Sequence, residues 1–80
     1  MTLRELDAVV LERDLPDAGL RRGDLGAVVY VHEDGALEVE FVRASGRTQA
    51  LVSLASRDVR AVQDADVPAV RTVDPHRGAA

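Results

Sequence analysis

Residues 27–43 read AVVYVHEDGALEVEFVR, and this stretch decides the fold because it describes two strands joined by a turn. β-Branched residues dominate the run from Ala27 to His32, and their stiff χ1 angle suits a pleated strand. Asp34-Gly35 between two apolar runs is typical of a β-hairpin, because both residues tolerate a positive φ. From Leu37 onward apolar and acidic residues alternate, so we expect one face of the second strand to be buried.

Short apolar runs on both sides of this hairpin extend the same pattern. Residues 6–12 are compatible with a strand or a helical turn, and the turn-forming residues 13–19 that follow, with Pro16, favour the strand. Four further segments follow the hairpin: a turn at residues 44–47, a strand at 48–54, a 3₁₀ turn at 55–58 and a strand at 59–62. Gly26 is predicted to lie where two strands approach closely or bend.

Together these elements predict an all-β fold: a small five-stranded SH3-like barrel with a 3₁₀ turn before the last strand and a mobile C-terminal tail. The competing OB barrel usually carries a helix between its third and fourth strands, and here only residues 45–46 occupy that place. We expect a single core that contains Val9, Val29, Val31, Val39, Phe41, Val52 and Val59.

The chain is expected to divide into a barrel domain at residues 1–63 and a tail at residues 64–80. The tail contains Pro68, Pro75 and Gly78, and its single valines follow no useful period. Such a segment buries too little apolar surface to offset the entropy of ordering its backbone, about 1–2 kcal/mol per residue. We therefore predict a disordered tail in the isolated protein, and the alternative is a tail that orders only on a partner.

The composition of the 80-residue chain is that of one small globular domain, with 46% hydrophobic and 30% charged residues. It has no run of eighteen apolar residues, so we expect no membrane span. An acid within the first five residues, with no apolar block behind it, argues against a secretory signal. The chain has no cysteine, which excludes disulfides, zinc–thiolate sites and thiol nucleophiles. These features predict a bacterial cytoplasmic protein.

The charge balance argues against nucleic acid as the partner. Ten arginines and no lysine oppose fourteen acidic residues, for a net charge of −4. Nonspecific affinity for a phosphate backbone comes from Lys and Arg side chains that displace counterions, so an acidic chain suits it poorly. Tyr30 and Phe41 are the only aromatic residues, which leaves little surface for stacked bases or proline-rich peptides. The Arg-only usage is compatible with bidentate recognition and equally with a GC-rich genome.

The two histidines give no indication of catalysis. His32 ends a strand beside Glu33 and Asp34, and such a pair suits a general base or a metal ligand. Adjacent strand residues point to opposite faces, however, so a solvated surface histidine is the simpler interpretation. His76 falls in the expected tail. We therefore predict that the protein is not an enzyme and that it uses no metal and no cofactor.

The acidic residues of the strands and turns have simple structural explanations. Glu38 and Glu40 alternate on one strand and share a face, where they suit a general acid–base pair or a cation site. A solvated face is the simpler interpretation, with Arg47 and Gln49 as cross-strand partners. Asp24 lies between two glycines, and we expect its carboxylate to accept hydrogen bonds from backbone amides of its own turn.

Several segments of the chain are similar to a known family. Residues 19–29, which read GLRRGDLGAVV, carry most of the resemblance, and EVEF at residues 38–41 and LVSL at residues 51–54 add to it. Over residues 6–62 the chain resembles a bacterial family of small stand-alone proteins that is catalogued as a domain of unknown function, and the resemblance implies an SH3-like barrel. More remotely, the chain is similar to the C-terminal barrel of the nitrile hydratase β subunit and to KOW-type barrels.

The long first loop is the best candidate for recognition, because this loop often contacts partners in SH3-like barrels. It offers apolar anchors and guanidinium groups together. The residues that we expect to bind a partner are Leu15, Pro16, Leu20, Arg21 and Arg22. For the two leucines, the alternative is that they close the open end of the barrel.

The resemblance implies genes in small operon pairs, some of them beside toxin-like genes. We therefore expect a non-enzymatic protein-binding module, an accessory or an antitoxin-like or immunity-like protein, whose partner is the product of a neighbouring gene. One alternative is a KOW-like nucleic-acid or ribosome-associated module. The other is a small subunit or activator of a nitrile hydratase-like metalloenzyme.

Overall fold

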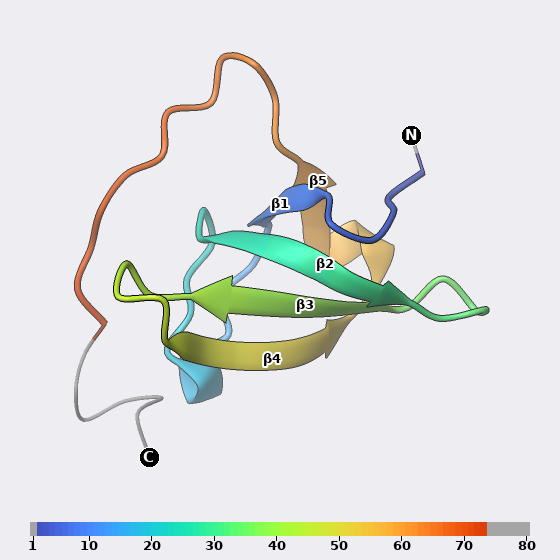
Figure 1. Cartoon of the computed structure of the whole chain (residues 1–80), viewed down its shortest axis with the longest axis horizontal. Coiled ribbons are helices and arrows are strands. Elements are labelled where there is room, and N and C mark those ends of the chain that lie inside the picture. Colours follow the sequence, from blue (N-terminus) through green and yellow to red (C-terminus); the bar gives the residue numbers. More distant parts are fainter. Residues whose placement is uncertain (1, 74–80) are drawn as a thin grey trace.

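The structure, a computed structural model, describes residues 2–73 and contains one sheet of five antiparallel strands in the order β4-β3-β2-β1-β5 (Figure 1). The strands are β1 (Ala8–Leu11), β2 (Leu25–Val31), β3 (Leu37–Val42), β4 (Thr48–Leu54) and β5 (Val59–Ala61), and the 3₁₀ turns are η1 (Pro16–Ala18) and η2 (Ser56–Asp58). The predicted all-β domain with five antiparallel strands and a 3₁₀ turn before the last strand is confirmed.

Two hairpins and one long loop connect the strands. β2, β3 and β4 are joined by short turns, whereas residues 12–24 separate β1 from β2 and contain η1. After β4 the chain turns through η2 and returns to β1, so that the first and last strands pair. The amide of Ala55 donates to the Asp58 carboxylate at 2.9 Å, which holds η2 closed at this change of direction. The short last strand is thereby placed beside β1.

The core lies on one side of this curved sheet. Its buried side chains are Val9, Leu11, Leu20, Val28, Leu37, Val39, Phe41, Leu54 and Val59, and the predicted core residues Val31 and Val52 pack against it half-buried. The prediction that Val29 belongs to the core is wrong, because its side chain is 36% exposed while that of Val28 is fully buried. A β-bulge between Val28 and Tyr30 shifts the register of β2 against β3. This bulge changes which residues of β2 face inward.

Gly26 lies on β2 where two core side chains of β3 pack against its backbone. A Cβ atom at this position would lie 2.8 Å from Phe41 Cε2 and 2.9 Å from Val39 Cγ1. The Phe41 ring therefore packs directly on the backbone of β2, which only a glycine permits. This contact joins the largest buried side chain to the strand that follows the long loop.

Beyond β5 the chain loops away from the sheet and returns towards the β3–β4 hairpin (Figure 1). Arg60 holds the start of this excursion, because its Nη1 and Nη2 donate to both carboxylate oxygens of Asp66 at 2.8 and 2.9 Å. The Gln63 amide donates to the same carboxylate at 2.7 Å. The hydrogen bonds from Arg60, and then that from Gln63, lower the pKa of Asp66 to about 2. The disorder of the tail stays a prediction, and His76 lies outside the described residues.

Candidate functional site

Hydrogen bonds close the loop between β1 and β2 and tie it to the sheet. The amides of Leu15 and Leu20 each donate to the carbonyl of the other residue at 3.0 Å. Between them η1 forms the tip of the loop, and Gly19 ends it in the left-handed region with a φ of 72°. On β4, the Gln49 side chain donates from Nε2 to the Ala18 carbonyl at 3.0 Å, which ties the tip to the sheet.

The five residues predicted to bind a partner divide into two groups. Leu20 is 4% exposed and belongs to the core, and Leu15 packs half-buried against that core. Both leucines therefore hold the loop on the domain, and the Leu20 side chain is almost fully buried. Pro16, Arg21 and Arg22 are exposed.

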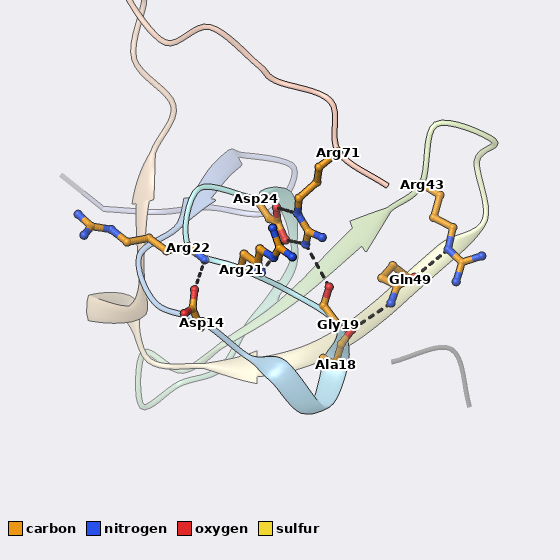
Figure 2. Close-up of polar contacts among 9 residues, drawn as sticks. All are labelled: Asp14, Ala18, Gly19, Arg21, Arg22, Asp24, Arg43, Gln49 and Arg71. Carbon is orange, nitrogen blue, oxygen red and sulfur yellow. Dashed lines mark hydrogen bonds and ion pairs between the residues drawn. The ribbon is translucent and has the colours of Figure 1, made fainter. Parts of the chain in front are cut away.

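The backbone beneath the two exposed arginines is fixed by carboxylates. The Arg21 amide donates to Asp24 Oδ2 and the Arg22 amide donates to Asp14 Oδ1, each at 2.8 Å (Figure 2). The first of these bonds is the turn interaction predicted for Asp24. Within residues 2–73 neither guanidinium group makes an ion pair or a side-chain hydrogen bond, so both are held out to solvent on a fixed backbone.

Asp24 has a second role that the sequence did not indicate. Arg71 Nε donates to Asp24 Oδ1 at 3.0 Å, and Arg71 Nη2 donates to Asp24 Oδ2 and, at 3.1 Å, to the Gly19 carbonyl (Figure 2). The hydrogen bond to Asp24 raises the pKa of Arg71. The two residues lie 47 positions apart, and no local pattern links them. Arg71 is thus a site residue that periodicity and turn signals alone do not reveal.

A groove of about 600 Å³ opens beside this ion pair. On the domain side it is lined by Leu20 and Phe41 from the core and by Leu25 and Val42, which are 49% and 50% exposed. Its other wall is the returning chain at residues 69–73. The groove therefore combines a carboxylate with apolar side chains at the end of the sheet that carries the β3–β4 hairpin.

A second polar cluster lies on β3 and its neighbours, around Glu38. His32 Nε2 lies 2.8 Å from Glu38 Oε2, and Ser53 Oγ donates to the same oxygen at 2.6 Å. The Ser53 hydrogen bond, and then the one with His32, lower the pKa of Glu38. In a catalytic triad the histidine stands between the hydroxyl and the acid, whereas here the acid stands between the histidine and the hydroxyl. The arrangement stabilises a carboxylate and does not activate a serine.

The cross-strand partners predicted for the two glutamates are wrong. The β3–β4 register places Ser53 opposite Glu38 and Leu51 opposite Glu40. Glu40 instead accepts a hydrogen bond of 2.6 Å from the Thr48 hydroxyl. The predicted pairing with Arg47 and Gln49 fails because the register is set by the hairpin turn and by a shift between Phe41 and Val42.

The described part of the chain holds neither a cluster of metal-ligating side chains nor a helix that could span a membrane. Among residues 2–73, no three His, Asp or Glu side chains come together in a way that would hold a metal ion. The same residues contain no helix with the length and apolar character needed to cross a membrane.

The chain matches the model of a protein family. The model of a family described as "Domain of unknown function (DUF4926)" matches residues 5–61. The matched range ends with β5, so the strands and the β1–β2 loop lie inside it and Arg71 lies outside it. Neither the curated proteins nor the solved structures gave a match.

Proposed function

The chain belongs to the DUF4926 family, and on that premise we propose that it is a non-enzymatic SH3-like barrel that binds another protein. Its partner is the product of a neighbouring gene, and its role in the bacterial cytoplasm is that of an accessory or an antitoxin-like or immunity-like protein. The strand order, the long β1–β2 loop and the 3₁₀ turn before β5 support the assignment to this class of barrel.

The observation that carries the proposal is the pair of exposed arginines on a fixed backbone. Amide bonds to Asp24 and Asp14 hold the main chain of Arg21 and Arg22 in place, so a partner that pairs with them does not have to order this loop. Preorganised arginine is favoured at protein interfaces, because its planar group pairs with carboxylates in a bidentate manner. The β1–β2 loop is thus suited to an acidic surface of a partner.

The distribution of charge supports the same conclusion. The chain carries a net charge of −4, yet the β1–β2 loop, the β3–β4 turn and residues 69–73 carry more arginines than acidic residues. These arginines are Arg13, Arg21, Arg22, Arg43, Arg47 and Arg71. The acidic residues in the same segments are Glu12, Asp14, Asp17 and Asp24, and Asp24 forms an ion pair with Arg71. A locally basic surface on an acidic domain orients an acidic partner as it approaches.

Co-expression with the adjacent gene product tests the proposal. The double variant Arg21→Glu/Arg22→Glu should lose the complex in a pull-down from purified components, because four units of charge change at the contact. Arg4→Glu/Arg57→Glu is the matched control, since both side chains are exposed and both adjoin β5 rather than the loop. This control should retain the complex.

Two results would overturn the assignment. One is a complex that survives the reversal of charge at Arg21 and Arg22. The other is micromolar affinity of the isolated protein for single-stranded or duplex nucleic acid with a steep salt dependence, which would favour a KOW-like module. The described residues offer few aromatic rings on which bases could stack, because Phe41 is buried. The ring of Tyr30 packs edge-on against that of His32, with 4.9 Å between the ring centroids.

A further inference from the structure

Asp24 and Gly19 form a receptor for a guanidinium group. The Asp24 amide donates to the Arg21 carbonyl at 3.0 Å, and its own carbonyl accepts from the Leu11 amide at 2.8 Å, so the backbone of Asp24 is fixed to β1 and to the loop. Its two carboxylate oxygens and the Gly19 carbonyl then face one side chain together. Three fixed acceptors in this arrangement match the fork of donors on arginine, and they do not match the single ammonium group of lysine.

The groove next to this receptor is only partly used by the chain itself. Leu25 and Val42 remain half exposed on its rim, although residues 69–73 form the opposite wall. Val70, which precedes Arg71, is 99% exposed and packs on neither of them. The returning segment therefore fills the guanidinium receptor and leaves the apolar part of the groove open. A ligand whose apolar side chains contact Leu25 and Val42 would bury more surface there than the returning segment does.

The returning segment is held at few points. Between Asp66 and Arg71, within the described chain, no hydrogen bond or ion pair joins the segment to the domain, and Val67 is exposed. Among residues 2–73, Arg71 makes the ion pair and the hydrogen bonds that join residues 69–73 to the domain, and the tether to β5 keeps the segment near the groove. A tether of this length holds the segment at an effective concentration of about 1 mM or somewhat more. An intermolecular ligand that makes additional contacts, and therefore binds the groove with higher affinity, can still displace the segment.

From these observations we propose that the groove at Asp24 binds an extended peptide segment of the partner protein, with an arginine between apolar residues. Residues 69–73, which read AVRTV, occupy the site in the free protein as an internal substitute ligand. This inference rests on the proposed protein-binding function and specifies one contact within it. The partner's arginine replaces Arg71 on Asp24, and its apolar neighbours cover Leu25 and Val42.

A peptide titration against the full-length protein tests the site. The probe is a fluorescently labelled peptide with the sequence of residues 67–73, VPAVRTV. Its affinity for the Arg71→Gln protein should be at least about tenfold higher than for the wild-type protein, because the tethered segment no longer competes. In two-dimensional NMR spectra, the amide signals of Gly19, Leu25 and Val42 should shift on addition of the peptide.

Two controls separate recognition of arginine from loss of structure. The Asp24→Asn exchange in the Arg71→Gln protein should abolish binding, and its circular dichroism spectrum shows whether the domain still folds. The second control changes the peptide and keeps the Arg71→Gln protein as it is. Peptides that carry Arg71→Gln or Arg71→Lys should fail to bind this protein, and this result does not require any further protein variant to fold. Equal affinity of the three peptides, or equal affinity for the wild-type and Arg71→Gln proteins, would overturn the proposal.

Sedimentation and complex formation distinguish a partner peptide in the groove from a second copy of the chain, and the groove from the Arg21–Arg22 contact. A wild-type protein that forms a dimer in sedimentation experiments, and an Arg71→Gln protein that does not, would show that the groove takes the tail of a second copy and would overturn the partner-peptide assignment. Retention of the purified complex by Asp24→Asn, with its loss in Arg21→Glu/Arg22→Glu, would refute the groove and leave the proposed function intact. Loss of the complex in neither variant would refute both.

Discussion

Two carboxylates, Glu38 and Asp24, collect polar partners in different ways. Glu38 accepts from His32, which follows β2 directly and lies 6 residues away, and from Ser53 on β4, which lies 15 residues away. Asp24 binds the Arg21 amide within its own turn and also Arg71, which lies 47 residues away beyond the last strand. The first cluster joins neighbouring strands, whereas the second joins the domain to a segment outside it.

This difference separates a structural cluster from a candidate site. The partners of Glu38 are fixed by the register of β2, β3 and β4, so the cluster forms whenever the sheet forms. The Arg71 contact forms only when a tethered segment returns to the sheet, and the groove beside it stays partly open. An interaction of this kind can be exchanged for an intermolecular one without unfolding the domain, and that property makes Asp24 the better candidate for function.

The substitution with the largest expected effect, at Phe41, should unfold the domain and so disrupt both carboxylate clusters. Phe41 packs on Gly26 and lines the groove, and it is the largest fully buried side chain. Phe41→Ala should cost about 3–5 kcal/mol through lost burial and a residual cavity. A domain of this size rarely has a stability above about 3–5 kcal/mol, so the variant should be unfolded at 25 °C. Two-dimensional NMR spectra should show collapsed amide dispersion, and a well-dispersed spectrum would contradict the core assignment.

Phe41→Leu is the control for this variant. Leucine retains an apolar side chain at the centre of the core, and the domain should still fold, with a lower midpoint in urea. The pair of variants therefore distinguishes the loss of packed volume from a specific requirement for the aromatic ring.

The sequence was informative where structure is local. The strand expected at residues 48–54 coincides with Thr48–Leu54, and Val9, Val39, Phe41 and Val59 are buried as predicted. Alternation of apolar and polar residues specifies a strand face directly, because side chains of a strand alternate strictly. The same reasoning failed at Val29, since one bulged residue changes the alternation and leaves no mark in the composition of a valine-rich run.

The candidate site was less accessible to sequence reasoning. Pro16, Arg21 and Arg22 are exposed in the long first loop, and their role in binding a partner stays a prediction. The burial of Leu20 depends on how the loop folds back through its bridge to Leu15. The contact of Arg71 with Asp24 depends on the path of a segment that lacks secondary structure. An ion pair between residues so far apart in the sequence leaves no periodic pattern and no motif, so only the three-dimensional structure reveals it.

A smaller effect is expected when either carboxylate is neutralised, and the decrease in Tm should differ between Asp24 and Glu38. Asp24→Asn removes the charge from a part-buried pair with Arg71, and we expect a cost of about 1 kcal/mol after allowance for solvent screening. In a domain of this size that cost corresponds to a decrease in Tm of about 4–8 °C. Glu38→Gln keeps an acceptor for Ser53 and His32 on an exposed cluster, so its Tm should fall less. Thermal unfolding followed by circular dichroism at pH 7 measures both.

The variant Arg71→Gln assigns the origin of the Asp24 effect. If the returning segment contributes to stability, Arg71→Gln should reproduce part of the decrease seen with Asp24→Asn. If Arg71→Gln leaves Tm unchanged, the effect arises from the bond to the Arg21 amide alone. A larger decrease for Glu38→Gln than for Asp24→Asn would reverse the ranking of the two clusters.

The smallest effect concerns the ion pair at which the excursion beyond β5 begins. The hydrogen bond from Arg60, followed by that from the Gln63 amide, lowers the pKa of Asp66 to about 2 from an ordinary value of 3.8. Because the pKa is lower in the folded chain, the interaction contributes its full stability above pH 3.8 and loses it as the pH falls through about 2. Carbon-13 NMR of the side-chain carboxyl should therefore show Asp66 ionised well below pH 3.8. In Arg60→Gln the titration should move up towards the ordinary value, because the larger of the two hydrogen-bonding contributions is gone. A wild-type titration near 3.8, or the same midpoint in both proteins, would show that this ion pair does not hold the start of the returning segment in solution.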